Sequence, residues 1–153
     1  MTSGALRLRP AEASDLYSLW LWANDPETRR ASFSRSPVSW SEHVAWFEQQ
    51  RGGAAHVLIG ETAEAQPVGS VRFDSTDGWQ TARLSYVVAP EARRQGWSRP
   101  LVTGGVGFLG SRRPGVAITA RVMADNRGSL RLFRVLGWSE SVDGGHHLFV
   151  HLP

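Results

Sequence analysis

One short segment of this chain has the composition of a phosphate-binding loop. Residues 93–99 read RRQGWSR and join an apolar strand-like segment to an apolar helix-like segment. Backbone N–H groups at the start of a helix converge on one point, and the positive end of the helix dipole attracts an anion there. Gly96 has no Cβ to block a close approach, and Ser98 adds a small hydroxyl. We expect this loop to bind a diphosphate, with a solvated basic loop as the alternative.

The loop is not a P-loop, because the signature G-x-x-x-x-G-K-S/T needs a lysine and this chain has none. The residues that we predict to form the phosphate site are Arg93, Arg94, Gln95, Gly96, Trp97, Ser98 and Arg99.

A second pattern marks a later helix. Asp125 or Asn126 is a suitable N-cap, Leu130 and Phe133 recur on one face, and Gly137 stands where a left-handed C-cap is needed.

Together, the two patterns resemble the GNAT superfamily of N-acetyltransferases. The acetyl-CoA loop of that family has the form R/Q-x-x-G-x-G/A, which residues 93–98 match with serine in the last small position. Its second signature, N-x-x-A/S-x-x-x-Y/F-x-x-x-G-F/W, is matched by Asn126, Ser129, Phe133, Gly137 and Trp138. The resemblance covers essentially the whole chain. It implies a single α+β domain, residues 1–153, with a central twisted, mostly antiparallel sheet, about four flanking helices and splayed central strands.

The resemblance also implies a reaction and a way of holding its cosubstrate. Acetyl would pass from acetyl-CoA directly to a primary amine, and a chain without cysteine agrees with direct attack. Backbone amides of Val87 and Val88 would bind pantetheine and the thioester oxygen. Asn126 would hydrogen-bond the pantetheine arm, which Ser129 and Phe133 would line.

Two catalytic side chains of many relatives are missing. Residues 82–86 read ARLSY where a glutamate base is common, and Phe133 stands where many relatives have a tyrosine acid. We expect Asp74 or His43 to act as the base, directly or through water, and Tyr86 to position substrate. The alternatives are a turn-forming role for Asp74 and a surface role for His43. We expect no metal cofactor.

The acceptor is suggested by a narrower resemblance in the first half of the chain. Residues 22–30 and 39–47 resemble GNAT enzymes that acetylate nucleotide-linked amino sugars, such as those of the pseudaminic-acid pathway. Asn24, Arg29 and Trp46 are then candidate substrate contacts, although core packing would equally explain Trp46. Acetylation of protein N-termini or antibiotics is an alternative. A non-catalytic acyl-CoA-binding module is an alternative of another class.

The elements that must position these residues alternate in type along the chain. A strand at 6–10 precedes a helix that Ser14 caps and that ends at residues 24–26. Ser39 and Glu42 form a capping box for a second helix, whose core stripe we expect to be Trp40, Val44 and Phe47. Strands at 56–61, 68–74 and 81–88 should pair consecutively and antiparallel. A helix at 100–109 that is buried on most faces, a strand at 116–122, the Asn126 helix and a hairpin turning at 144–145 complete the series.

Composition limits the partners. The chain has 153 residues, 41% of them hydrophobic, and lacks a run of eighteen apolar residues, so we expect a cytoplasmic protein without a membrane partner. The pI near 10.5 overstates the basicity, since all 17 basic residues are arginine and the net charge is only +3. Acidic residues are interspersed among them, so we expect no nucleic-acid partner. A small-molecule amine is the expected partner, bound by a monomer or homodimer.

Overall fold

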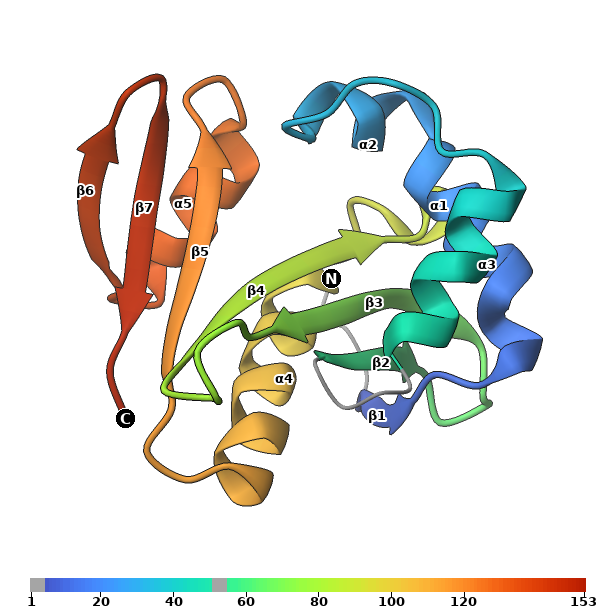
Figure 1. Cartoon of the computed structure of the whole chain (residues 1–153), viewed down its shortest axis with the longest axis horizontal. Helices are drawn as coiled ribbons and strands as arrows, with labels where there is room; N and C mark the ends of the chain where they lie inside the picture. Colours follow the sequence, from blue (N-terminus) through green and yellow to red (C-terminus); the bar gives the residue numbers. More distant parts are fainter. Residues whose placement is uncertain (1–4, 51–54) are drawn as a thin grey trace.

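The computed structural model describes residues 5–50 and 55–153, which fold around one seven-stranded sheet (Figure 1). The strand order is β1-β2-β3-β4-β5-β7-β6. The strands are β1 (Arg7–Pro10), β2 (Ala55–Glu61), β3 (Pro67–Asp74), β4 (Thr81–Val88), β5 (Ala117–Met123), β6 (Ser139–Asp143) and β7 (His146–His151). The three consecutive antiparallel strands predicted from sequence are β2, β3 and β4, and the predicted hairpin is β6–β7.

The centre of the sheet opens into a V. Strands β4 and β5 are parallel, but they pair only between residues 81–83 and 117–119. Beyond this short contact β5 continues with β7 while β4 continues with β3, so the two halves of the sheet diverge (Figure 1). This confirms the predicted splay and leaves a gap between the later residues of β4 and β5.

Helices cover the two faces of the sheet unequally. They are α1 (Leu16–Asn24), α2 (Pro26–Ala31), α3 (Trp40–Gln49), α4 (Ser98–Arg112) and α5 (Arg127–Val135). Val71 of β3 faces Gly105 of α4, whereas the next residue, Arg72, lies beneath the Trp46 ring of α3. Successive side chains of a strand therefore point to opposite faces of the sheet. We call the face covered by α4 and α5 the α4 face, and the face on which α3 lies the α3 face.

The core consists of two clusters. The larger one lies between the sheet and helices α4 and α5, with Phe73, Phe133 and Phe149 fully buried. The second joins α1 and α3 to the sheet and includes Trp22 and Trp97. Because Trp97 belongs to the predicted phosphate loop, this cluster anchors the loop to the body of the domain.

The first helix starts later than predicted. Ser14 does not cap it; Ser14 lies within a 3₁₀ turn at Ala13–Asp15, and α1 begins at Leu16. Glu12 and Asp15 form the capping box instead, with the Glu12 N–H donating to Asp15 at 2.7 Å. Arg9 fixes that carboxylate through two hydrogen bonds of 2.8 and 2.9 Å. This capping box closes the 3₁₀ turn, and Asp15, the N-cap residue of α1, makes no side-chain cap hydrogen bond to α1.

Helix α2 was not predicted, and it raises the number of α-helices to five in the described chain. The helix α1 ends at Asn24 as expected, but Asp25 then accepts hydrogen bonds from the backbone N–H groups of Glu27 and Thr28. Pro26 occupies the first helical position, where its missing N–H has no cost. The same three residues that end one helix therefore start another.

The prediction of which α3 residues face the core was partly wrong. Trp40 is 42% exposed and Val44 half-buried, whereas His43 and Phe47 are buried. The buried face of α3 is rotated relative to the predicted one because His43 can be buried: its ring nitrogen hydrogen-bonds the Leu16 carbonyl inside the protein. Ser39 caps α3 by accepting the Glu42 N–H at 3.2 Å, as predicted, but among the described residues the second hydrogen bond of the predicted capping box, from the Ser39 N–H to the Glu42 side chain, is not formed.

Helix α4 is also less enclosed than predicted, since its residues Thr103, Gly104, Gly107 and Gly110 are exposed and only one side faces the core. A G-x-G-x-x-G match at residues 105–110 lies inside this helix, whereas a dinucleotide-binding site needs that pattern between a strand and a helix start.

The signals around α5 are confirmed. Asn126 caps the helix by accepting the Ser129 N–H at 3.3 Å, and Gly137 has a φ of +80° just after its end. Within the described part of the chain, no helix combines the length and apolarity needed to span a membrane.

Candidate active site

The edge of β4 that faces the gap carries free backbone groups. Beyond Arg83, β4 has lost its pairing with β5. The Ala89 N–H donates to Val68 O at 2.8 Å, so odd-numbered residues of this stretch turn their backbone groups toward β3. By alternation, the N–H and C=O groups of Tyr86 and Val88 point toward the gap. Of the two predicted backbone donors, Val88 faces the gap and Val87 faces β3.

A glycine that sequence reasoning did not single out fixes this edge. A Cβ on Gly69 would lie 2.3 Å from Val87 O and 2.9 Å from a Leu101 methyl. Strand β4 and helix α4 therefore approach β3 too closely for any other residue. A glycine in the middle of a strand was the available signal.

The predicted phosphate loop has left-handed backbone at two residues. Arg94 has a φ of +62° and Gly96 a φ of +82°, while Trp97 is right-handed, an alternation that turns successive N–H groups to one side. Trp97, the N-cap residue of α4, makes no side-chain cap hydrogen bond. The N–H groups of its first residues, Ser98 and Arg99, are therefore available to an anion. A Cβ on Gly96 would meet no protein atom within 4 Å, so the backbone angle, not packing, requires glycine here.

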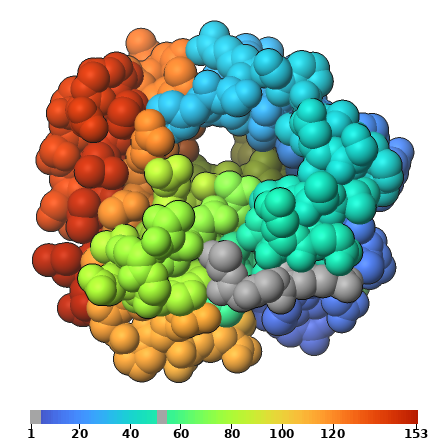
Figure 2. All heavy atoms as spheres, in the orientation of Figure 1, coloured from blue at the N-terminus to red at the C-terminus, as the bar shows by residue number. Residues whose placement is uncertain are grey.

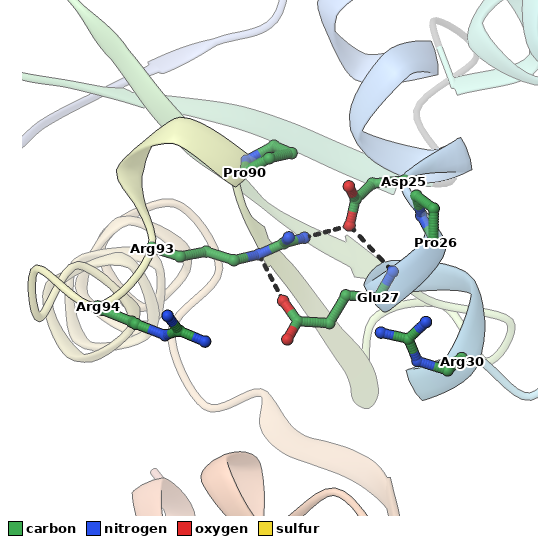
Figure 3. A pocket seen from close by; sticks show the side chains of 7 residues that line it. All are labelled: Asp25, Pro26, Glu27, Arg30, Pro90, Arg93 and Arg94. Carbon is green, nitrogen blue, oxygen red and sulfur yellow. Dashed lines mark hydrogen bonds and ion pairs between the residues drawn. The ribbon is translucent and has the colours of Figure 1, made fainter.

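Arg93 is used within the protein. Its guanidinium contacts Asp25 at 2.6 Å, Glu27 at 2.9 Å and the Thr28 hydroxyl at 3.2 Å (Figure 3). Burial raises the pKa of Asp25, but the hydrogen bond from Arg93 and those from the α2 backbone outweigh it and hold the pKa below its ordinary value. Arg93, which was predicted to bind phosphate, fastens the loop to α2 through these contacts.

A pocket of about 600 Å³ lies between α2 and the loop. The exposed side chains of Arg94 and Arg30 point into it from opposite sides (Figure 3). Gln95, in contrast, folds onto the loop, where it accepts the Trp97 Nε1–H at 3.2 Å. The predicted loop residues thus divide into Arg94, Ser98 and Arg99, which are available to a ligand, and Arg93, Gln95 and Trp97, which hold the loop.

Tyr86 and the start of α5 meet on the α4 face of the gap. The Tyr86 hydroxyl lies 2.5 Å from the Ser129 hydroxyl, and its ring makes an edge-on contact with Phe133 at 6.3 Å between centroids. Burial raises the pKa of Tyr86, so the phenol is protonated at neutral pH. The structure therefore brings together Tyr86, Ser129 and Phe133, with Asn126 capping the same helix.

His43 does not reach the gap. It is 4% exposed, and its Nε2 lies 2.8 Å from Leu16 O. A carbonyl only accepts, so Nε2 carries the proton, and burial lowers the pKa of the ring. Its ring stacks on the Trp46 ring at 5.4 Å between centroids and also contacts the Trp40 ring at 5.8 Å. Because these contacts hold His43 as a neutral packing residue, we do not retain it as a candidate base.

Asp74 lies at the closed end of the V. It pairs with Arg83 in the β3–β4 register, beside the last residues that β4 shares with β5. Its carboxylate contacts Arg72 Nε at 2.8 Å and is partly exposed on the α3 face.

Two predicted substrate contacts organise a loop. Asn24 hydrogen-bonds both backbone groups of Val38, at 2.9 and 2.7 Å. Arg29 donates to Ser34 O at 3.0 Å and to Ser36 O at 3.1 Å. These bonds shape residues 32–39, a segment that we name the arch. Asn24 and Arg29 thus use their polar groups within the protein.

The arch spans the V on the α3 face. Phe33 contacts the other arm of the sheet, with the Arg121 guanidinium 4.5 Å from its ring centroid and the His146 ring edge-on at 5.4 Å. Figure 2 shows an opening beneath the light-blue end of this segment, bounded by green strand residues and by the orange β5–α5 arm. The arch was missed from sequence; a single phenylalanine among serines was its only signal.

The arrangement suits two substrates that meet in the gap. Backbone N–H groups that an anion could bind lie where β4 leads into α4, unpaired backbone groups line β4, and a protonated phenol lies beside them. In the described residues, no three His, Asp or Glu side chains gather in a way that could hold a metal ion.

Comparison with known proteins agrees with this geometry. A family model described as "Acetyltransferase (GNAT) domain" matches residues 5–139. No curated protein matches the sequence.

Solved structures share the fold at low sequence identity. A spermidine N-acetyltransferase from Vibrio cholerae, in complex with CoA and spermine, is 19% identical with a TM-score of 0.85, over 96% of this chain and 95% of that one. A domain from Methanocaldococcus jannaschii is 18% identical with a TM-score of 0.85, over 99% and 100%. A GNAT superfamily phosphinothricin acetyltransferase from Sinorhizobium meliloti, in complex with AcCoA, is 19% identical with a TM-score of 0.79, over 96% and 88%. The chain therefore belongs to the GNAT family of acetyltransferase domains.

Proposed function

We propose that this protein transfers acetyl from acetyl-CoA directly to the primary amine of a small molecule. The observation that carries the proposal is the gap between β4 and β5, which has an uncapped, left-handed loop at one end and unpaired backbone groups along its edge. Family membership supports it, as do the CoA and AcCoA bound by two proteins of the same fold.

Acetyl-CoA fits the residues present. Its diphosphate oxygens would accept hydrogen bonds from the backbone N–H groups of Ser98 and Arg99. Arg94 and Arg30 would supply positive charge from the adjoining pocket. The pantetheine arm would follow β4, where the free N–H and C=O groups of Tyr86 and the free C=O of Val88 match its amides. Asn126, Ser129 and Phe133 are the side chains that we propose to line the same route.

The acyl transfer needs a developing negative charge to be stabilised and a leaving sulfur to depart. Acetyl-CoA supplies the activated acyl group, and the amine attacks its carbonyl carbon. The Val88 N–H is the donor that we propose for the carbonyl oxygen, a contribution of about 3 kcal/mol in comparable sites. Phe133 cannot donate a proton. The protonated Tyr86 hydroxyl, next to it, is the group that we propose to hydrogen-bond the sulfur.

The amine must lose a proton before it attacks. Asp74 is the carboxylate that we propose to accept this proton. It pairs with Arg83 at the closed end of the V, away from Val88, so the proton would reach it through a chain of water molecules along the α3 face. An amino sugar, free or nucleotide-linked, is the acceptor that we propose, supported by the resemblance of residues 22–30 and 39–47. A protein N-terminus or an antibiotic amine is the alternative acceptor.

A non-catalytic acyl-CoA-binding module is favoured by one observation: residues 82–86 lack the glutamate base that many relatives have there, and Phe133 stands where many have a tyrosine acid. Amine-dependent release of CoA from acetyl-CoA discriminates the two, since a binding module releases none.

The cosubstrate assignment is tested with Gly96→Val and thermal unfolding. Acetyl-CoA at a hundred times its Kd should stabilise the native protein by about 2.7 kcal/mol. Valine strongly disfavours the left-handed backbone found at residue 96, so the variant should lose this stabilisation. Arg131→Gln, on the exposed side of α5, is the control and should keep it. Equal acetyl-CoA affinity in wild type and Gly96→Val would remove the phosphate-loop assignment.

A further inference from the structure

The α3 face of the V is the side from which an acceptor can enter. On the α4 face, the β4 and β5 side chains nearest the gap, Tyr86, Ala120 and Val122, are covered by α4 and α5. On the α3 face, register places Ser85 and Arg83 on β4 and Thr119 on β5 around the gap. Figure 2 views the molecule from this side, where the opening beneath the arch is visible. The chemistry of this face therefore selects the acceptor.

Positive charge is in excess on this face. Three arginines point to it from adjacent strands, Arg72, Arg83 and Arg121. Asp74 neutralises Arg72 through a 2.8 Å contact. Among the described residues, Arg83 and Arg121 have no carboxylate within ion-pair distance. Two guanidinium charges on the walls of the V are thus available to a ligand.

One of these arginines is held in place. Arg121 lies 4.5 Å from the Phe33 ring centroid, and its Nε is 3.4 Å from His146 Nε2. A guanidinium stacked on a ring keeps its N–H edge free, and that fork matches the oxygens of a carboxylate or phosphate. The arch therefore contributes a ring that holds the Arg121 guanidinium on the α3 face, beside His146 of β7.

These arginines are not placed to bind the diphosphate of acetyl-CoA. Arg83 precedes Val88 by five residues of extended strand, about 17 Å at 3.3 Å per residue, and the phosphate loop lies beyond Val88. Their side chains also point to the α3 face. Their ligand is then a group of the acceptor.

We propose that the acceptor carries an anionic group, a carboxylate or a phosphate, in addition to its amine, and that Arg83 and Arg121 bind it. This inference rests on the proposed acetyl transfer. An amine without an anionic group finds no partner for the two charges, and a polyamine is repelled by them. A phosphorylated amino sugar and an amino acid share the required chemistry.

Matched acceptors test the preference through amine-dependent CoA release. Glucosamine 6-phosphate is compared with glucosamine, and γ-aminobutyrate with butylamine, so that each pair differs by one phosphate or one carboxylate; spermidine is the polyamine. The wild type should show a kcat/KM at least about tenfold higher for the anionic member of one pair. The pair that responds identifies the anion.

Substitutions locate the effect. Arg83→Gln and Arg121→Gln should each remove most of the preference for the anionic member while changing kcat/KM for the neutral member less than about twofold. Arg131→Gln is the matched control on α5 and should preserve the preference. Binding of the same compounds to the CoA complex, measured by calorimetry, provides a readout independent of turnover.

The inference is overturned if neutral amines or spermidine are preferred in both assays, if neither assay separates the members of either pair, or if the arginine variants weaken all acceptors equally. Failure of acetyl-CoA to bind, or of any amine to release CoA, would instead count against acetyl transfer itself. Calorimetry would still decide whether the V binds anionic amines.

Discussion

Replacing Arg93 with alanine should destabilise the protein rather than remove a phosphate ligand. The guanidinium is 25% exposed and contacts Asp25, Glu27 and Thr28. Charge-assisted hydrogen bonds contribute about 1.5–3 kcal/mol each when shielded, and exposed ion pairs about 0–1 kcal/mol. The Glu27 carboxylate is 55% exposed, so its share is at the low end. Asp25 keeps its two backbone hydrogen bonds and is not left unpaired.

We therefore expect a loss of about 2 kcal/mol in the free energy of unfolding, or roughly 4–8 °C in Tm for a domain of this size. Circular dichroism at pH 7 without ligand measures it. Arg94→Ala is the matched control: its side chain is exposed in the pocket beside α2, so Tm should stay within about 1 °C while acetyl-CoA affinity falls.

The effect of Arg93→Ala on Tm should also depend on pH. The pKa of Asp25 in the native state is below its ordinary value, so its contribution is present above the unfolded pKa of about 3.9 and is lost as pH falls through the native pKa. The difference in Tm between wild type and Arg93→Ala should narrow below about pH 4. An unchanged Tm together with weakened acetyl-CoA binding, as in Arg94→Ala, would refute the reasoning and return Arg93 to the phosphate site.

Four further predictions follow from single contacts. Tyr86→Phe should lower kcat by about tenfold or more, with acetyl-CoA affinity measured by calorimetry nearly unchanged. Asp74→Asn should lower kcat by about a hundredfold and leave acetyl-CoA affinity intact; a near-normal rate would assign the proton to water alone. Gly69→Ala should lower Tm more than any exposed substitution, because its Cβ would lie 2.3 Å from Val87 O. Burial lowers the pKa of His43, so folding stability should be greatest above about pH 6.5 and decline as pH falls through the native pKa; His43→Gln should flatten that decline in denaturant titrations.

Local patterns predicted the elements that carry the site. The alternation of β2, β3 and β4, the Asn126 cap and the Gly137 C-cap depend on residues within a few positions of one another, so they can be inferred before any tertiary contact is known. The predicted phosphate loop could be inferred in the same way, since the glycine at residue 96 is required by its own left-handed backbone angle.

Partners distant in sequence escaped prediction. Arg93 meets Asp25 across 68 positions, and His43 finds the Leu16 carbonyl across 27, so neither role is encoded near the residue itself. Asn24 and Arg29 have the composition of ligand contacts, but the backbone of the arch takes up their hydrogen bonds.

The sequence by itself thus predicted the helices and strands except α2, the left-handed turn that we propose to bind an anion, and the family, because each follows from short-range periodicity and spacing. Only the tertiary structure decided which charged groups are left over for ligands. A side chain such as Arg83 or Arg93 is identical in the unfolded chain, and it becomes a ligand contact or a structural clamp according to whether folding brings a carboxylate to it.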